Sequence, residues 1–232
     1  MSQFPRFALI FLPTVLIALT ALSGCSVHFG GGHGWHGVRG SGVEATVQHQ
    51  MPVFTAIQTS GSVELIVTVG NSGPVEVTAD DNILPHLRIE VEGDTLIVEP
   101  RHSIRPKTRI TVRAATPTLA SVSASGATDI TVHNVDSPKF TIDISGAAEV
   151  DVTGRCGHLD AGVSGAAELE LAALIVQTAE IRISGAGEAD VHAEQEVRAT
   201  VSGAGEIRNH GAGKVIGNVS GAGSIHSVHG GD

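Results

Sequence analysis

The chain has 232 residues and a formal net charge of −10 at pH 7, and aromatic residues make up 3% of it. A chain this negative is repelled by nucleic acid phosphates, so we expect no nucleic acid partner. The shortage of aromatic side chains also disfavours a carbohydrate-active enzyme, because such enzymes commonly hold sugars on aromatic platforms.

The first 24 residues have the pattern of an export signal. Arg6 precedes an apolar run over residues 7–22, which is short for a membrane span. The run ends in Leu-Ser-Gly-Cys at residues 22–25, which resembles the lipobox of bacterial lipoproteins, where the cysteine becomes the lipidated first residue of the mature chain. We therefore expect residues 1–24 to be a lipoprotein signal peptide and Cys25 to carry a lipid. An uncleaved anchor or an ordinary signal peptide is the alternative.

Residues 25–44 are rich in glycine and show no hydrophobic period, which predicts a flexible linker between the lipid and a folded domain. His28, His33 and His36 are possible metal ligands here, but ordering a glycine tract has a high entropic cost, so a solvated linker is preferred. Ser26, rather than aspartate, follows the lipobox cysteine, and in lipoproteins this favours the outer membrane, facing either the periplasm or the cell surface.

Residues 45–228 are the expected folded domain, and 45–115 contain strands of irregular spacing. A degenerate Ser60-Gly61 phrase opens one strand, Glu92-Gly93-Asp94 predicts a hairpin turn, and residues 80–84 predict a helical turn stopped by Pro85. We expect this region to cap a larger β-structure, because an uncovered end would expose unpaired strand edges. A separate small domain is the alternative.

In residues 116–228, a phrase beginning Ser-Gly-Ala recurs six times at intervals of 18 to 20 residues. Its serines are Ser125, Ser145, Ser164, Ser184, Ser202 and Ser220. Apolar and polar residues alternate on both sides of each phrase, which predicts two short strands joined at Ser-Gly, with glycine supplying a corner of positive φ. This period indicates coils that bury their apolar faces by stacking. We expect an all-β fold, specifically a right-handed parallel β-helix, a solenoid with rungs of about 18–20 residues.

Several segments together resemble the head-GIN-domain family, whose members are secreted bacterial proteins labelled auto-transporter adhesins. The segments are residues 54–61, 96–98 and 119–126 and the repeated Ser-Gly-Ala-Gly phrases. The resemblance covers residues 50–226 and implies a parallel β-helix. It implies no catalytic residue for this chain.

Carboxylates occupy two fixed positions of the repeat, four and six residues after its serine. This acidic stripe consists of Asp129, Glu149, Asp151, Glu168, Glu170, Glu188, Asp190 and Glu206. In stacked coils, neighbours in each row lie about 4.8 Å apart and repel by about 0.9 kcal/mol in water. The stripe is a candidate site for a divalent cation or a basic partner. A solvated face that resists aggregation is the alternative and the commoner outcome of such rows.

Five of the 14 lysines and arginines lie within thirteen residues. They are Arg101, Arg105, Lys107, Arg109 and Arg113. This cluster is a candidate contact for lipid or lipopolysaccharide phosphates, or for the acidic stripe of a second copy, and the sequence leaves the oligomeric state open. A solvated loop is the alternative.

Catalytic motifs are missing from the sequence, which contains neither Gly-x-Ser-x-Gly nor His-Glu-x-x-His. With two cysteines, Cys25 and Cys156, no disulfide framework is available once Cys25 is lipidated. We therefore expect no enzyme, no cofactor and no firm metal site. The predicted function is a lipid-anchored adhesion, binding or structural module of the cell envelope, with a protein or polysaccharide partner. A β-helix enzyme acting on envelope polysaccharide and an envelope-stress or scaffolding lipoprotein are the alternatives.

Overall fold

The computed structural model of this protein describes residues 37–228. This part of the chain is all-β, and it contains no α-helix. The described residues belong to one compact unit. The predicted signal peptide of residues 1–24, the lipidation site Cys25 and the three linker histidines lie outside the described residues.

Twelve strands and one 3-10 turn make up the fold. The elements are β1 (Val38–Arg39), β2 (Glu44–His49), β3 (Ala56–Val69), β4 (Val75–Asp80), η1 (Leu84–His86), β5 (Leu87–Glu92), β6 (Thr95–Pro100), β7 (Ile104–Arg105), β8 (Thr111–Thr116), β9 (Ser121–Gly203), β10 (Glu206–Asn209), β11 (Lys214–Gly221) and β12 (Ser224–Ser227).

The large sheet is mixed. Its main path runs β12-β10-β9-β3-β8-β4-β2, while β1 and β7 form a separate parallel pair. Strands β3, β10, β11 and β12 pair in parallel along the repeats, but β2–β4, β4–β8 and β5–β6 are antiparallel. The parallel pairing expected of the β-helix therefore extends only in part to the N-terminal strands, where β3 pairs in parallel with β6 and β8. At β5–β6 the reason is the two-residue connection Gly93-Asp94, since so short a turn joins only antiparallel strands.

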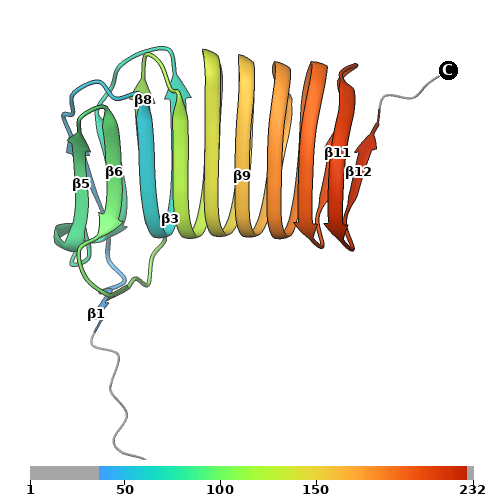
Figure 1. Ribbon diagram of the computed structural model, residues 1–232. Coiled ribbons are helices and arrows are strands. Elements are labelled where there is room, and N and C mark those ends of the chain that lie inside the picture. Colours follow the sequence, from blue (N-terminus) through green and yellow to red (C-terminus); the bar gives the residue numbers. More distant parts are fainter. Residues whose placement is uncertain (1–36, 229–232) are drawn as a thin grey trace, which may run out of the picture. The chain divides into compact units, whose positions relative to one another are not determined.

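The repeats form successive passes of one chain that pair side by side. Strand β9 alone runs for 83 residues, and its passes lie between β3 and β11 (Figure 1). In β3 and along most of β9 the two predicted strands of a repeat are therefore one, because backbone pairing continues through the Ser-Gly corner; in the last two repeats they are separate, with β10 following β9 and β12 following β11. The register matches the repeat: Ser60 and Gly61 pair with Ser125 and Gly126. The degenerate first phrase is thus a true first copy.

The corner glycines stack backbone on backbone. Gly126, Gly146, Gly165, Gly185, Gly203 and Gly221 all have φ between 107° and 137°. A Cβ added to any of them would overlap the carbonyl oxygen of the corner glycine in the preceding pass, well inside 3.0 Å. Glycine is therefore required twice over, for the positive φ and for the close approach of the next pass.

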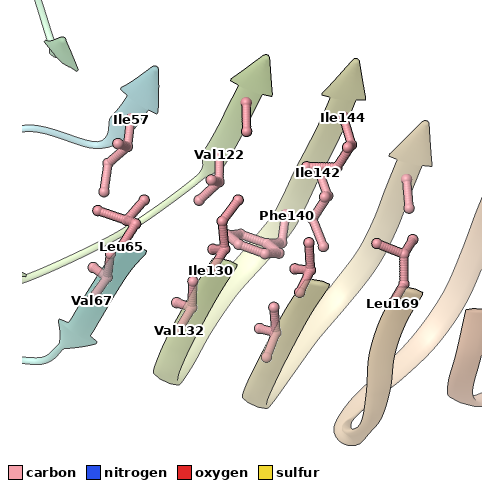
Figure 2. Packing of buried hydrophobic residues seen from close by; sticks show 14 of the residues in the cluster. Ile57, Leu65, Val67, Val122, Ile130, Val132, Phe140, Ile142, Ile144 and Leu169 are labelled. Atoms are coloured by element: carbon pink, nitrogen blue, oxygen red, sulfur yellow. The ribbon is translucent and has the colours of Figure 1, made fainter. Parts of the chain in front are cut away.

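The core lies between the two arms of each pass. Alternate residues on either side of a corner point inward, so that Ile57 and Leu65, from the two arms of β3, point toward each other (Figure 2). In the next two passes Ile130, Phe140 and Ile142 fill the same interior and are at most 2% exposed (Figure 2). Burying an aliphatic side chain of this size contributes about 1.5–3 kcal/mol, so stacking holds the passes together.

The last turn of the repeat region uses a buried amide. Asn209 is fully buried at a position where earlier passes carry an aliphatic residue. Its side-chain oxygen accepts hydrogen bonds from the backbone N–H groups of Ala193 and Gly211, and its amide nitrogen donates to the carbonyls of Gly211 and Gly213. The side chain thereby satisfies backbone groups of the 209–213 turn.

The N-terminal region differs from expectation at one turn. The hairpin at Gly93 is confirmed, with a positive φ of 64°. The helical turn expected at 80–84 is instead a 3-10 turn at Leu84–His86. Pro85 lies in its first turn and does not stop it, because the first helical residues need no N–H donor.

A buried carboxylate joins the start of the domain to the loop before β8. Asp80 is fully buried and accepts hydrogen bonds from the backbone N–H groups of Gly42 (2.6 Å), Lys107 (2.7 Å) and Thr108 (3.1 Å). Burial alone would raise the pKa of Asp80, but these hydrogen bonds outweigh it and lower the pKa. Residues 38–44, which the sequence assigned to the linker, therefore take part in the fold.

The corner glycines generate a prediction. Gly185→Ala should lower the free energy of unfolding by about 3 kcal/mol or more, because the new Cβ overlaps the backbone of Gly165 and the φ is unfavourable. Gly93→Ala is the matched control, since Gly93 also has positive φ but open space around it, and should cost about 1 kcal/mol. Denaturant unfolding of both variants gives the comparison, and equal losses would contradict the backbone stacking.

Candidate functional site

An open groove of about 1040 Å³ follows the corners of the repeats. Its floor is formed by the residue two places after each repeat serine, and this residue is always alanine. The floor alanines are Ala127, Ala147, Ala166, Ala186, Ala204 and Ala222. Because these side chains are small and stacked, they leave a trough. The loop of residues 106–110 lies at its N-terminal end.

Carboxylates four places after the serine line this groove. This groove row consists of Glu64, Asp129, Glu149, Glu168, Glu188 and Glu206. The register confirms the stacking where it is described, with Glu64 opposite Asp129 and Glu188 opposite Glu206. Five of the eight residues of the acidic stripe thus come together in the groove, while Asp151, Glu170 and Asp190 do not line it.

Sequence reasoning missed Glu64 as a member of the row. The signal was present, because Glu64 follows Ser60 by four residues in the degenerate first phrase. Its side chain accepts hydrogen bonds from Thr111 at 2.7 Å and Arg109 at 3.3 Å. Glu64 therefore carries the row into the N-terminal region.

Arginines neutralise the two ends of the row. Arg109 lies 3.3 Å from Glu64 and 3.0 Å from Asp129. At the other end Arg208 lies 3.3 Å from both Glu188 and Glu206.

The middle of the acidic stripe has no such partner. Within residues 37–228, Glu149, Asp151, Glu168 and Glu170 form no ion pair with any lysine, arginine or histidine. Glu149, Glu168 and Glu170 are exposed. Uncompensated negative charge is therefore concentrated on two adjacent passes, of which Glu149 and Glu168 line the centre of the groove.

Arg208, His210 and Asp190 form a second cluster that sequence reasoning missed. Arg208 donates two hydrogen bonds to Asp190, at 2.7 and 2.8 Å, and His210 Nε2 lies 2.7 Å from Asp190 Oδ1. These bonds, with that from Arg208 the largest cause, lower the pKa of Asp190 to about 2. The signal was again in the repeat, since Asp190 and Arg208 share one repeat position and pair in register.

The five clustered cations divide into two groups. Arg109 pairs with the groove row, and Arg113 lies 4.0 Å from Glu76 on β4. Arg101, Arg105 and Lys107 are exposed and form no ion pair within the described range. Two of the five cations of the predicted patch, Arg109 and Arg113, therefore already lie next to carboxylates of the same domain.

The geometry of the described residues gives little support to a metal site or to a catalytic thiol. No group of three or more His, Cys, Asp or Glu side chains in residues 37–228 is placed to hold a metal ion. Cys156 is buried, and burial raises the pKa of its thiol to about 11, so it is no thiolate nucleophile at neutral pH. A recess of about 260 Å³ beneath the loop 102–106 has a mainly apolar wall that includes Leu87, Val98 and Ile110.

The Asp190 cluster generates a pH prediction. Because the pKa of Asp190 falls from 3.8 to about 2 on folding, its contribution to stability is complete above about pH 4 and is lost as pH falls toward 2. In Asp190→Asn, the decrease in unfolding free energy between pH 4 and 2 should be smaller than in the wild type by about 1–2 kcal/mol. Asp143→Asn, which removes an exposed carboxylate that forms no hydrogen bond among the described residues, is the charge-matched control, and equal changes in the two variants would contradict the prediction. Denaturant midpoints measured across this pH range test both.

Comparison with known proteins identifies the family. Residues 53–213 match the family described as "Putative auto-transporter adhesin, head GIN domain". The fold is similar to the crystal structure of a putative adhesin from Bacteroides fragilis NCTC 9343, with a TM-score of 0.64 and 21% identity over 83% of this chain and 100% of that chain. It is also similar to the crystal structure of a putative adhesin from Parabacteroides merdae ATCC 43184, with a TM-score of 0.52 and 20% identity over 82% of this chain and 98% of that chain. No curated protein matches this chain. Within residues 37–228, no helix has the length and hydrophobicity needed to cross a membrane. The family match spans more than half of this chain. The chain therefore belongs to the head-GIN-domain family, as the sequence motifs indicated.

Proposed function

We propose that this protein is a lipid-anchored binding module of the bacterial cell envelope, whose groove takes an extended partner that carries several positive charges. The observation that carries the proposal is the groove row beside a floor of alanines, at whose centre no lysine, arginine or histidine of residues 37–228 forms an ion pair. The adhesin description of the family supports a role in binding at the cell surface or within the envelope.

An extended polycation fits the groove better than a single ion. Carboxylates on successive passes repeat about every 4.8 Å along one line, so no three of them converge on a point. A chain laid along the line can engage several carboxylates at once, and the alanine floor lets its backbone approach closely. A divalent cation, the other candidate from the sequence, would need three or more oxygen ligands from one place.

Binding is favoured over catalysis by the composition of the groove. Its described lining contains neither histidine nor cysteine, so a serine or cysteine nucleophile activated by histidine cannot be assembled there. Outside the groove, the low pKa of Asp190 keeps that carboxylate ionised, whereas a general acid needs a raised pKa. We therefore prefer a binding module to an enzyme of envelope polysaccharide. A purely structural scaffold is the remaining alternative, and it requires no ligand in the groove.

We further propose that the domain is a right-handed parallel β-helix with an N-terminal cap, carried on a glycine-rich linker after a signal peptide of residues 1–24. The parallel pairing along β9 and the stacked corner glycines support the helical path, and right-handed crossovers are the rule for parallel strands. The linker ends near residue 37, because β1 already pairs with β7. The lipobox-like motif supports anchoring at the outer membrane.

The groove proposal predicts a defined binding loss. A labelled lysine decamer should bind the wild type at low ionic strength, and Glu149→Gln with Glu168→Gln should weaken this binding about tenfold, because the unpaired charges at the centre are removed. Asp143→Asn with Glu194→Gln changes net charge equally outside the groove and should have little effect. Fluorescence anisotropy measures both, and high salt should abolish binding. Equal losses in the two double variants would contradict a groove site.

The anchor proposal predicts a specific modification. Mass spectrometry of the protein extracted from bacterial membranes should find an N-terminal peptide that begins at Cys25 and carries acyl chains. Cys25→Ala should abolish this modification and leave the signal segment attached. An unmodified Cys25 within a longer peptide of the membrane-extracted wild type would exclude the anchor.

A further inference from the structure

Most cations of the described chain are paired with carboxylates. The paired ones are Arg88, Arg109, Arg113, Lys139, Arg155, Arg182, Arg198 and Arg208. Within residues 37–228, the cations without an ion pair are Arg39, Arg101, Arg105, Lys107 and Lys214. Four of these five belong to β1 and the loop 101–107. The unpaired cations are therefore concentrated in one part of the fold.

The structure brings three of these residues, Arg39, Arg105 and Lys107, together at the β1–β7 pair, and Arg101 precedes that pair in the same segment; we call the four the tether-end patch. The parallel register of β1 and β7 puts Arg39 directly beside Arg105. Backbone hydrogen bonds from Val38 to Ser103 and from Gly40 to Arg105, at 2.9 and 2.8 Å, fix that pair. Lys107 Nζ donates to the carbonyl of Ser41 at 3.0 Å. All four side chains are exposed.

Two acids next to the patch, Asp80 and Asp81, reduce its net positive charge but form no ion pair with its four cations within residues 37–228. Asp80 is buried and accepts backbone N–H groups, including that of Lys107. The Asp81 carboxylate accepts hydrogen bonds from the Ser41 hydroxyl and the Asn82 backbone N–H. Two arginines held side by side repel each other, so the arrangement disfavours a free patch and favours a polyanionic surface as its partner.

We propose that the tether-end patch docks on the anionic phospholipid headgroups of the membrane leaflet that holds the lipid anchor. This inference rests on the proposed anchor at Cys25, which lies twelve residues before Gly37, where the described chain begins. Twelve residues span at most about 40 Å, so the anchor keeps the patch close to the bilayer. The uncompensated carboxylates of the groove are repelled by the same surface, which favours docking by the patch and keeps the groove open to a partner.

The test uses the lipidated full chain, labelled at a single new cysteine and reconstituted in vesicles that contain a headgroup-labelled acceptor lipid. A donor dye at Ser103→Cys reports the tether-end patch, and one at Ser227→Cys, on β12, reports a distant strand. The native Cys156 is buried and does not compete for the dye. Quenching at position 103 should be stronger on vesicles with phosphatidylglycerol than on phosphatidylcholine alone, and salt should remove the difference. The ratio of docked to undocked domains should rise about fivefold per cation engaged.

The decisive variant is Arg39→Gln, Arg101→Gln, Arg105→Gln and Lys107→Gln together, which should abolish the response to anionic lipid. The matched control, Lys139→Gln, Arg155→Gln, Arg198→Gln and Lys214→Gln together, removes four cations elsewhere and should retain it. An equal response in both variants, or none in the wild type, overturns the docking surface. If the protein fails to associate with neutral vesicles, the anchor proposal fails instead. The patch is then still tested by binding to anionic vesicles, which only the first variant should lose.

Discussion

The fold depends on one close contact, the approach of each corner backbone to the corner before it. Because glycine carries no side chain, Gly185 can lie directly over Gly165 with its φ at 131°. This contact fixes the register of every pass on the last, so residues at the same repeat position stand in line. Aliphatic lines form the core, alanine lines form the groove floor, and carboxylate lines form its charged wall.

Alignment of identical residues has an electrostatic consequence. Apolar residues gain by standing over one another, but carboxylates in line repel, and the repulsion grows with each pass that is added. The protein relieves it only at the two ends of the groove row, where Arg109 and Arg208 each contact at least two acids. Glu149 and Glu168 keep their charge uncompensated within the described domain. Because the centre of the row gains no ion pair that would stabilise the fold and yet lies along an open groove, we infer that it serves a partner rather than stability.

Unpaired cations and the unpaired acids of the groove centre lie on different parts of the fold. Most cations without an ion pair lie where β1 pairs with β7, next to the point at which the described chain begins, while Glu149 and Glu168 lie on central passes of β9. In an anchored protein this distribution gives the two charged regions different tasks. The tether-end patch would meet the lipid surface, and the groove would meet the partner.

The sequence by itself determined the features that repeat. The period of 18 to 20 residues, the alternation around each Ser-Gly corner and the acids four residues later predicted the all-β fold, the core positions and most of the groove row. They did so because residues one period apart become neighbours. Only the tertiary structure decided where non-repeating residues go: the antiparallel strands β2 and β4, the burial of Asp80, and the division of the cation cluster between Arg109 and the tether-end patch. Those partners lie 20 to 45 residues apart without a common period, so local pattern carries no information about their pairing.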